Sequence, residues 1–258
     1  MKDLDQSEEL FLELNRSIVN LYKLCMEEMG YDLGPTYNNV EYYNYLANDP
    51  IYFYRNDESS YEDLDAILSQ VDFSNYKGEL ISVDQLMKIL PNANRNYAAA
   101  AISALDKYGE KVGLTTVGKL MVLAQFAHES GQFRFTYEQG FGKGRPYGRP
   151  TGPYGKVYYG RGPIQITWEA NYKAITNNCF PKIGIDANIH RDPDLCCTNL
   201  EIGCAASLCW FMLPGNGKRA IAAANAGDVK ALSKAINGGY TGLKERMEFT
   251  KKIFDAVK

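Results

Sequence analysis

The sequence predicts a mainly α-helical domain of the α+β class with few short strands, preceded by a small acidic N-terminal segment. Apolar residues recur at helical spacing over most of residues 81–258, while strand-like patterns are confined to 132–137 and 156–159. Charge divides the chain at the same place: residues 1–80 carry 17 acidic and 5 basic side chains, although the formal net charge of the whole chain is only −3. We therefore expect an acidic part at 1–80 and a basic part, with a balance of +9, at 81–258.

The acidic N-terminal part is rich in tyrosine. An amphipathic helix is expected over residues 5–30, and residues 31–80 contain nine of the 19 tyrosines. Dense tyrosine is typical of contact surfaces, so this part either anchors or targets the protein or forms a solvated acidic face over a small core. The N-terminus lacks a basic region followed by a clean apolar run, and no stretch of 18 apolar residues occurs. Neither a signal peptide nor membrane insertion is therefore expected.

The basic part is expected to consist of short capped helices and one long loop. Ser82 and Gln85 form a capping-box pattern for a helix that stops at Pro91, and Asn94 begins an alanine-rich helix that ends at Gly109. Gly, Pro and basic residues fill the segment after the third helix, which is typical of a functional loop. That loop is expected over 140–162, and further helices are expected from Thr115 or Thr116 to Gly131 and over about 164–177, 199–213, 216–226, 228–236 and 241–257.

The six cysteines show no metal-binding spacing. Five of them lie within 31 residues, but there is no CxxC pair and no zinc template fits. Two of the five fall in the apolar helical pattern CAASLCWFML, where thiols act as small core residues. Reduced thiols, in keeping with synthesis in a reducing cytoplasm, are therefore expected at Cys25, Cys179, Cys196, Cys197, Cys204 and Cys209.

Two glutamates are the candidates for acid–base chemistry. Glu129 lies in AHESGQF at the end of a helix, and Glu138 follows nine residues later in FTYEQG. A glycoside hydrolase needs one protonated carboxyl group for the leaving oxygen and one carboxylate that activates water or attacks carbon. The helix C-terminus and flanking apolar residues are expected to favour the protonated form of Glu129, and nearby Lys143 and Arg145 the charged form of Glu138. Spacing alone is weak evidence, since surface glutamates nine residues apart are common.

The segment YYGRGPIQITWEANY, residues 158–172, carries a second set of candidates. Gln165 and Thr167 alternate after a Gly-Arg-Gly-Pro turn, and Asn171 lies one helical turn beyond Thr167, so the three side chains can share one edge of a groove. Their polar groups suit sugar hydroxyls, acetamido groups and a bound water. The alternative interpretation is a plain turn followed by ordinary capping residues.

These motifs resemble the family 19 glycoside hydrolases, which include chitinases of plants and bacteria and endolysins of bacteriophages. The resemblance covers about residues 81–258 through six motifs in order: ISVDQLMKILPNA, LAQFAHESGQF, YYGRGPIQITWEANY, DPDL, CWFM and INGGYTGLKERMEF. It implies a lysozyme-like catalytic domain and inverting chemistry. The short interval between the two glutamates is more similar to the phage endolysins, while residues 1–80 resemble neither a chitin-binding module nor a common peptidoglycan-binding repeat.

The resemblance implies a role for each matching position. Glu129 in the HE[ST] motif corresponds to the general acid, Glu138 to the general base, and Thr167 to the hydroxyl residue that helps to position the attacking water. The positions that bind substrate or support the site are His128, Tyr159, Gln165, Asn171, Asn237 and Arg246. No metal and no cofactor are implied.

The leading hypothesis is a muramidase-type lysin that hydrolyses the β-1,4 bonds of bacterial peptidoglycan, whose glycan strands are its partner. The positive balance of residues 81–258 suits an anionic polymer, whereas chitin is neutral. Such a protein is expected in a host cytoplasm until its release to the cell wall. One alternative is a chitinase acting on N-acetylglucosamine polymers. Another is a lysin of the phage tail or baseplate, which residues 1–80 anchor to a phage structural protein.

Three other classes of protein fit the sequence less well. A metal-dependent amidase lacks its motif, because HESGQ is not HExxH and only two histidines are present. A nucleic-acid-binding protein would use Arg145, Arg149 and Arg161, but the neighbouring carboxylate pair favours a glycan. A wall-binding protein without activity would not need two acid–base carboxylates.

Overall fold

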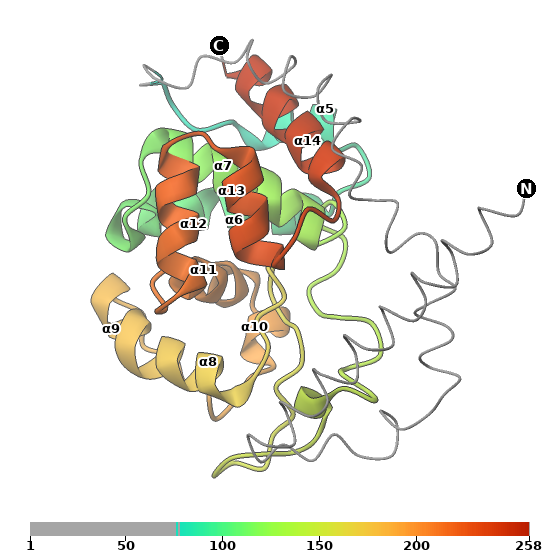
Figure 1. The fold of residues 1–258 in the computed structure, drawn as a ribbon, viewed down its shortest axis with the longest axis vertical. Helices are drawn as coiled ribbons and strands as arrows, with labels where there is room; N and C mark the ends of the chain where they lie inside the picture. The colour runs from blue at the N-terminus through green and yellow to red at the C-terminus, as the bar shows by residue number, and fades with distance from the viewer. Residues whose placement is uncertain (1–75, 77, 258) are drawn as a thin grey trace, which may run out of the picture. The chain divides into compact units, whose positions relative to one another are not determined.

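The computed structural model describes residue 76 and residues 78–257, and the regular secondary structure of this part of the chain is almost entirely helical (Figure 1). The mainly helical fold predicted from the sequence is confirmed. The helix expected at 5–30 and the tyrosine-rich segment lie outside the described residues, and the division of the chain after residue 80 stays a prediction. No helix in the described part combines the length and the apolar character needed to cross a membrane.

β-Structure among the described residues is limited to single bridges. The segments expected as short strands, 132–137 and 156–159, contribute to these bridges without forming a ladder. The three antiparallel bridges pair Tyr137 with Arg161, Arg161 with Ile166, and Thr151 with Lys156. They fold the long loop back on itself beside the helices.

The first three helices of the described part start at the caps that the sequence predicts. α5 (Val83–Ile89) begins after Ser82, which forms a capping box with Gln85. α6 (Arg95–Tyr108) is capped by Asn94 and α7 (Thr116–Glu129) by Thr115, and the short 3-10 turn η3 (Glu110–Val112) lies between them. Each capping side chain accepts a hydrogen bond from a backbone N–H three residues on, so local sequence is enough to predict it.

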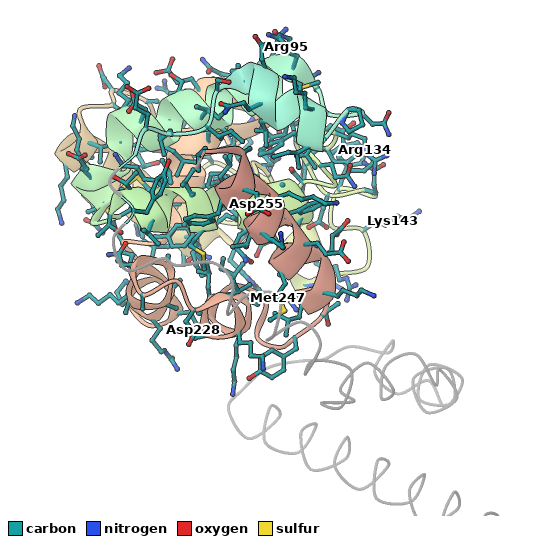
Figure 2. The ribbon with its side chains drawn as sticks, turned by 90° about the horizontal axis from the view of Figure 1, so that it is seen from above. Arg95, Arg134, Lys143, Asp228, Met247 and Asp255 are labelled. Carbon is teal, nitrogen blue, oxygen red and sulfur yellow. A yellow bond between two sulfur atoms is a disulfide. The ribbon has the colours of Figure 1, made fainter. Side chains whose placement is uncertain are left out.

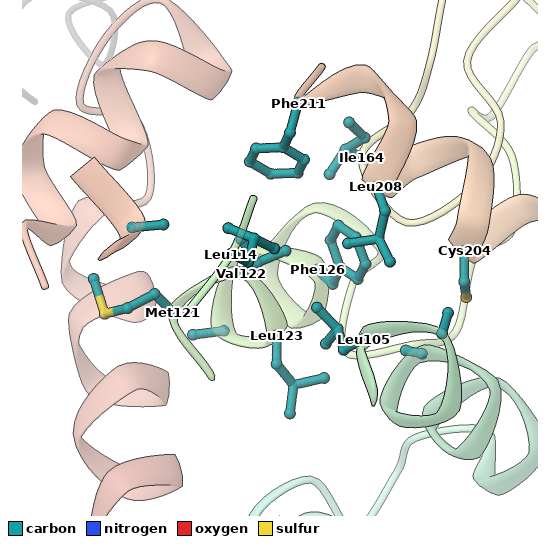
Figure 3. Close-up of a cluster of buried hydrophobic side chains, with 14 of the residues drawn as sticks. Leu105, Leu114, Met121, Val122, Leu123, Phe126, Ile164, Cys204, Leu208 and Phe211 are labelled. Atoms are coloured by element: carbon teal, nitrogen blue, oxygen red, sulfur yellow. The ribbon is translucent and has the colours of Figure 1, made fainter. Parts of the chain in front are cut away.

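α7 lies at the centre of the helical core. Every residue from Val117 to Ala127 is buried, and α6, α12 and α14 pack against this helix. Figure 3 shows the α7 side chains Val122 and Phe126 in one apolar cluster with Leu208. Because α7 is enclosed nearly all round, its position is fixed by the core, and so is the position of the residue that ends it, Glu129.

From Glu169 on, the described chain adds eight helical segments. The helix expected from residue 164 starts only at Glu169, because Gln165 and Trp168 have φ angles of 55° and 72°, which a right-handed helix cannot contain. The segments are α8 (Glu169–Ala174), the π-helix η5 (Ile175–Cys179), α9 (Phe180–Ile183), α10 (Leu195–Thr198), α11 (Leu200–Trp210), α12 (Asn216–Asn225), α13 (Val229–Asn237) and α14 (Leu243–Ala256).

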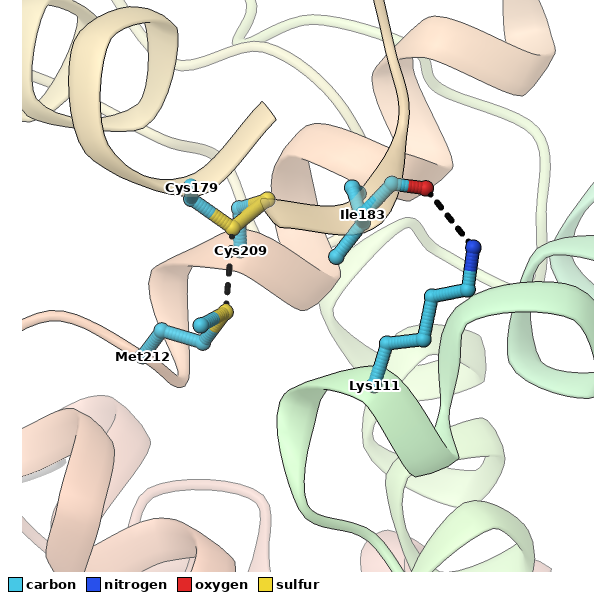
Figure 4. The surroundings of a disulfide bond; sticks show 5 residues. All are labelled: Lys111, Cys179, Ile183, Cys209 and Met212. Carbon is cyan, nitrogen blue, oxygen red and sulfur yellow. Dashed lines mark hydrogen bonds between the residues drawn. A yellow bond between two sulfur atoms is a disulfide. The ribbon is translucent and has the colours of Figure 1, made fainter. Parts of the chain in front are cut away.

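A disulfide joins Cys179 at the end of η5 to Cys209 on α11 (Figure 4). The expectation of reduced cysteines is therefore wrong for this pair, whose members are 30 positions apart in the sequence. Sequence spacing does not reveal that η5 and α11 contact each other, and only this contact brings the two thiols together. Cys196, Cys197 and Cys204 are free, and Cys25 lies outside the described residues.

Candidate active site

Glu129 is held by a buried arginine. Arg246 on α14 is only 1% exposed, and its Nη2 donates to Oε1 of Glu129 at 2.5 Å. The Nη1 of the same guanidinium donates to Oε1 of Gln125, one turn earlier on α7, and its Nε donates to the carbonyl oxygen of Thr241. The sequence predicted apolar surroundings for Glu129, whereas α14 places a cation directly against its carboxylate.

His128 supports the contact between α7 and α14 from the position next to Glu129. Its Nδ1 lies 2.5 Å from Oε2 of Glu245. Its ring also packs against Gly242, where a Cβ atom would lie 2.1 Å from His128 Cε1. Burial lowers the pKa of His128 from its ordinary value of 6.5, and the charge of Arg246 lowers it further. His128 therefore favours its neutral form in the folded protein.

Glu138 is held by the backbone of the Gly-Arg-Gly-Pro turn. Its N–H donates to the carbonyl oxygen of Gly160 at 2.8 Å, and its Oε2 accepts from the N–H of Gly160 at 2.9 Å. This neutral backbone donor takes the place of the ion pairs that the sequence suggested with Lys143 and Arg145, and neither of these two residues forms a salt bridge with Glu138 in the described structure.

Gly160 brings Glu138 and Gln165 together. A Cβ atom at Gly160 would lie 2.8 Å from Glu138 Oε2 and 2.9 Å from Gln165 Oε1, so only glycine fits between the two side chains. Nε2 of Gln165 donates to the carbonyl oxygen of Gly162 at 2.9 Å, while Oε1 is buried and has no hydrogen-bond partner. Because a buried acceptor without a partner is costly, Gln165 Oε1 is available for a donor from a bound molecule or a water.

The other sequence-predicted residues occupy three different settings. Thr167 is half-buried, and its carbonyl oxygen accepts a 2.9 Å hydrogen bond from Asn171 Nδ2, so the Asn171 amide braces the turn that carries Thr167. The Tyr159 ring covers the guanidinium of Arg161 at 3.4 Å. Asn237 is the last residue of α13 and is exposed. The structure thus brings Glu129 to Arg246 and Glu138 to Gln165, and the roles of the individual residues stay predictions.

A left-handed turn connects the two glutamates. Gly131, Gln132 and Phe133 have φ angles of 58°, 63° and 56°. Positive φ is strained for the two residues with side chains, and such strain persists only where the surroundings enforce it. Phe133 supplies this restraint, because its ring is fully buried and packs edge to face on Tyr97 of α6 at a centroid distance of 5.6 Å.

Two supporting contacts between basic and acidic side chains are not predicted by the sequence. Arg161 is 2% exposed and pairs with Asp194, and His190 Nε2 lies 2.9 Å from Oε1 of Glu169. The sequence offered one signal, because Asp194 belongs to the DPDL motif and Arg161 to the Gly-Arg-Gly-Pro turn. The described residues contain no group of three or more potential ligands that could hold a metal ion.

The described helical domain thus holds two carboxylates, Glu129 and Glu138, in fixed positions, and comparison with known proteins shows what this domain is similar to. Residues 116–238 match the chitinase class I model of glycoside hydrolase family 19. Chitinase C from Streptomyces griseus has 23% sequence identity and a TM-score of 0.51, with 71% of this chain and 95% of that one covered. A bacterial family 19 chitinase has 22% identity and a TM-score of 0.50, with 69% and 94% covered. Residues 116–238 thus match glycoside hydrolase family 19, and the fold is similar to that of solved chitinases of this family.

Similar curated proteins come from plants. An endochitinase of Arabidopsis thaliana is 46% identical over 79 residues, which are 29% of this chain and 26% of that protein. A second Arabidopsis endochitinase is 35% identical over 147 residues, 54% of this chain and 46% of that protein. A chitinase-like protein of Hevea brasiliensis that is named inactive is 33% identical over 84 residues, 31% of this chain and 25% of that protein. The chain thus spans at most about half the length of these relatives.

Proposed function

We propose that this protein hydrolyses β-1,4 bonds of an N-acetylglucosamine polymer of the chitin type, with inversion. One observation carries the proposal: two carboxylates nine residues apart have different partners, Glu129 the buried guanidinium of Arg246 and Glu138 the backbone N–H of Gly160. Acid–base cleavage of a glycoside requires two carboxyl groups with different roles. The endochitinase names of the relatives favour chitin as the polymer.

In the proposed reaction, Glu129 protonates the oxygen of the leaving sugar and Glu138 removes a proton from the attacking water. Glu129 must carry a proton at the start, and this breaks its ion pair with Arg246. The guanidinium then still has two acceptors, Oε1 of Gln125 and the carbonyl oxygen of Thr241, so it is not left buried without partners. The water attacks from the opposite face of the ring, which requires the two carboxyl groups to stand about 6.5–9.5 Å apart.

Substitution of the two glutamates tests this proposal. Glu129→Gln and Glu138→Gln should each lower the rate of hydrolysis of chitin oligomers by about 10²–10⁴-fold. Exposed Glu79→Gln is the matched control and should retain full activity. Proton NMR of the first product should show the inverted anomer. Activity of Glu129→Gln near that of wild type, or a product of retained configuration, would contradict the proposal.

Bacterial peptidoglycan is the second candidate substrate, and the charge of the long loop favours it. No acidic residue occurs between residues 139 and 168, whereas Lys143, Arg145, Arg149 and Lys156 are all exposed there. Lys143 lies on this loop at the edge of the helical part (Figure 2). Because a neutral polymer gains nothing from these charges, they suit a glycan that carries carboxylates.

The loop charges allow the two substrates to be compared directly. Replacement of all four exposed bases by glutamine should slow peptidoglycan hydrolysis at low salt and leave hydrolysis of chitin oligomers unchanged, since neutral oligomers are not steered by charge. Wild type that cleaves chitin oligomers and leaves peptidoglycan intact would remove this second candidate.

The setting in which the protein works is a separate proposal. If peptidoglycan is the substrate, we propose that the protein leaves the cytoplasm before it acts and that residues 1–80 attach it to a phage particle or to the wall. The Cys179–Cys209 disulfide agrees with action outside a reducing compartment. Deleting residues 1–80 should abolish association with particles or walls and preserve hydrolysis of soluble oligomers. Unchanged association would exclude the anchoring role.

A further inference from the structure

The tip of the long loop, residues 151–156, is an exposed turn that lies against a carboxylate of α8. The N–H of Thr151 donates to the carbonyl oxygen of Lys156 at 2.9 Å and closes the turn. Gly152 follows Thr151, and a Cβ atom on this glycine would lie 2.2 Å from Oε1 of Glu169, the first residue of α8. Thr151 Oγ1 also donates to Glu169 Oε2, at 3.5 Å. The loop tip is therefore packed directly onto the Glu169 carboxylate.

The same carboxylate contacts a buried histidine. His190 is 6% exposed, and its Nε2 lies 2.9 Å from Glu169 Oε1. Tyr154 of the loop tip, although exposed, meets the His190 ring edge to face at a centroid distance of 5.0 Å. The loop tip thus contacts both members of the Glu169–His190 pair.

The Glu169–His190 pair is fixed by contacts that do not involve the loop tip. The backbone N–H of His190 donates to Thr176 Oγ1 of η5 at 3.1 Å, and the carbonyl oxygen of His190 accepts from the hydroxyl of fully buried Tyr158 at 2.7 Å. Glu169 belongs to a helix that continues into η5. The pair is therefore part of the helical body, and the loop tip is the segment that it holds.

The loop tip is flanked by positive charge. Arg149 and Lys156 are both exposed, and neither forms a salt bridge with a described acidic residue. Glu169 is the first acidic residue after the loop, and its side chain pairs with His190 instead of with either base. Because a cation on an ordered segment loses less conformational entropy on binding than one on a mobile segment, holding the tip strengthens binding of an anion.

We propose that Glu169 and His190 form a clasp that holds the loop tip and thereby fixes Arg149 and Lys156 for contact with the carboxylates of an anionic glycan. The inference rests on peptidoglycan, the second candidate substrate of the proposed function. Glu169 and His190 are positioning residues in this role, because they act through the loop and not on the reacting atoms. The clasp determines specificity, since a neutral glycan gains nothing from the two fixed bases.

Proteolysis tests the clasp without reference to activity. Trypsin does not cleave before proline, and both arginines within residues 140–157 precede one, so its targets there are Lys143 and Lys156. In Glu169→Ala, cleavage after Lys156 should become about tenfold faster, because a tip that has lost its contacts opens more often. Cleavage after Lys143, outside the tip, should change by less than about twofold and serves as the internal reference.

Two further variants complete the proteolysis experiment. Tyr154→Ala removes the contact with His190 from the loop side and leaves α8 intact, so it should also speed cleavage after Lys156, and it decides the test if Glu169→Ala does not fold. Glu79→Ala is the matched control, because it makes the same substitution at an exposed glutamate outside the loop, and it should cleave as wild type does.

Kinetics on two substrates tests the effect on specificity. In Glu169→Ala, KM for soluble peptidoglycan fragments should rise about tenfold with kcat within about twofold, because the bases must be ordered again on binding. Both constants for chitin oligomers should stay within about twofold of wild type. In the background Arg149→Gln/Lys156→Gln, the added Glu169→Ala substitution should change KM by less than about twofold, because the clasp acts through these two bases.

The outcomes separate the clasp from the proposed function. Cleavage after Lys156 at the wild-type rate in folded Glu169→Ala would overturn the clasp. Faster cleavage with an unchanged KM for peptidoglycan fragments, or an equal rise in KM without the two bases, would overturn the specificity role. Wild type that leaves peptidoglycan intact would remove this substrate and the specificity role with it, while the cleavage rates would still decide whether Glu169 and His190 hold the loop tip.

Discussion

Arg161 donates to a single oxygen of Asp194 from two of its nitrogens, Nε at 3.0 Å and Nη2 at 2.7 Å. The two residues are 33 positions apart, and their pairing connects the Gly-Arg-Gly-Pro turn to the DPDL motif. The remaining donors of Arg161 reach the carbonyl oxygens of Val157 and Tyr159 and the hydroxyl of Tyr172. The turn that holds Glu138 is therefore folded around one buried guanidinium.

This arrangement predicts that replacing Arg161 lowers the free energy of unfolding more than replacing Asp194. Arg161→Lys should lower the free energy of unfolding by about 3 kcal/mol, because an ammonium cannot reach the same acceptors and leaves several of them buried. Asp194→Asn should cost only about 1 kcal/mol, since the Asp194 side chain is 58% exposed and water can replace it. Urea unfolding monitored by circular dichroism measures both values. A larger loss for Asp194→Asn than for Arg161→Lys would contradict this account.

Gly160→Ala should damage the site more than the fold. The added Cβ would come within 3 Å of Glu138 Oε2 and Gln165 Oε1, and both side chains would have to move. We expect kcat to fall by at least about tenfold, which corresponds to a displaced base, with little change in the melting temperature. Gly239→Ala is the control, because a Cβ there meets no atom within 4 Å. Equal activity of the two variants would show that Gly160 does not fix the carboxylate.

Reduction of the disulfide should destabilise the domain. A crosslink between residues 30 positions apart is expected to contribute about 3 kcal/mol, chiefly by restricting the unfolded chain. Dithiothreitol should therefore lower the urea midpoint of wild type and have no effect on the Cys179→Ala/Cys209→Ala double variant, which should start from the lower value. If the reductant shifts both proteins equally, the remaining thiols are responsible instead.

His128 should make the stability of the domain depend on pH near neutrality. Burial, with Arg246 as the next cause, lowers its pKa below 6.5, so below this pH the unfolded chain binds a proton that the folded protein does not. The free energy of unfolding should accordingly decline as pH falls from about 6.5 toward the folded-state pKa, and it should level off below that value. Unfolding measured at several pH values between 5 and 7 should show a shallower decline for His128→Asn. Identical slopes would mean that His128 is not buried in its neutral form.

Local signals in the sequence predict most of the helices and few of the contacts that build the site. Ser82, Asn94 and Thr115 cap the helices that they are expected to cap, because each acts on a backbone group three residues away. The sequence also singled out Glu129 and Arg246 as members of one site, but through family motifs, and it did not predict their direct contact. That contact joins residues 117 positions apart, and neither periodicity nor local spacing contains this information.

The late start of α8 and the Cys179–Cys209 bond are two further features that local sequence signals do not predict. Helical periodicity continues through residue 165, yet Gln165 has a φ of 55° and its side chain donates to the carbonyl oxygen of Gly162 within the Gly-Arg-Gly-Pro turn. The apolar pattern around Cys209 correctly predicts a helix, and the bond depends on η5 approaching that helix in space. Turn geometry overrides helical periodicity at Gln165, and a long-range contact between η5 and α11 decides the disulfide.

The left-handed turn at 131–133 makes the site depend on a remote helix. Phe133 packs against Tyr97, so the segment that joins Glu129 to Glu138 is fixed near its start by a residue of α6. Tyr97 is far in the sequence from any expected substrate-binding position. An inserted or deleted residue here would break that contact and would change the span between acid and base. Substitutions in the alanine-rich helix α6 that leave the fold intact can therefore still change the distance between the carboxyl groups of Glu129 and Glu138, across which a water must fit.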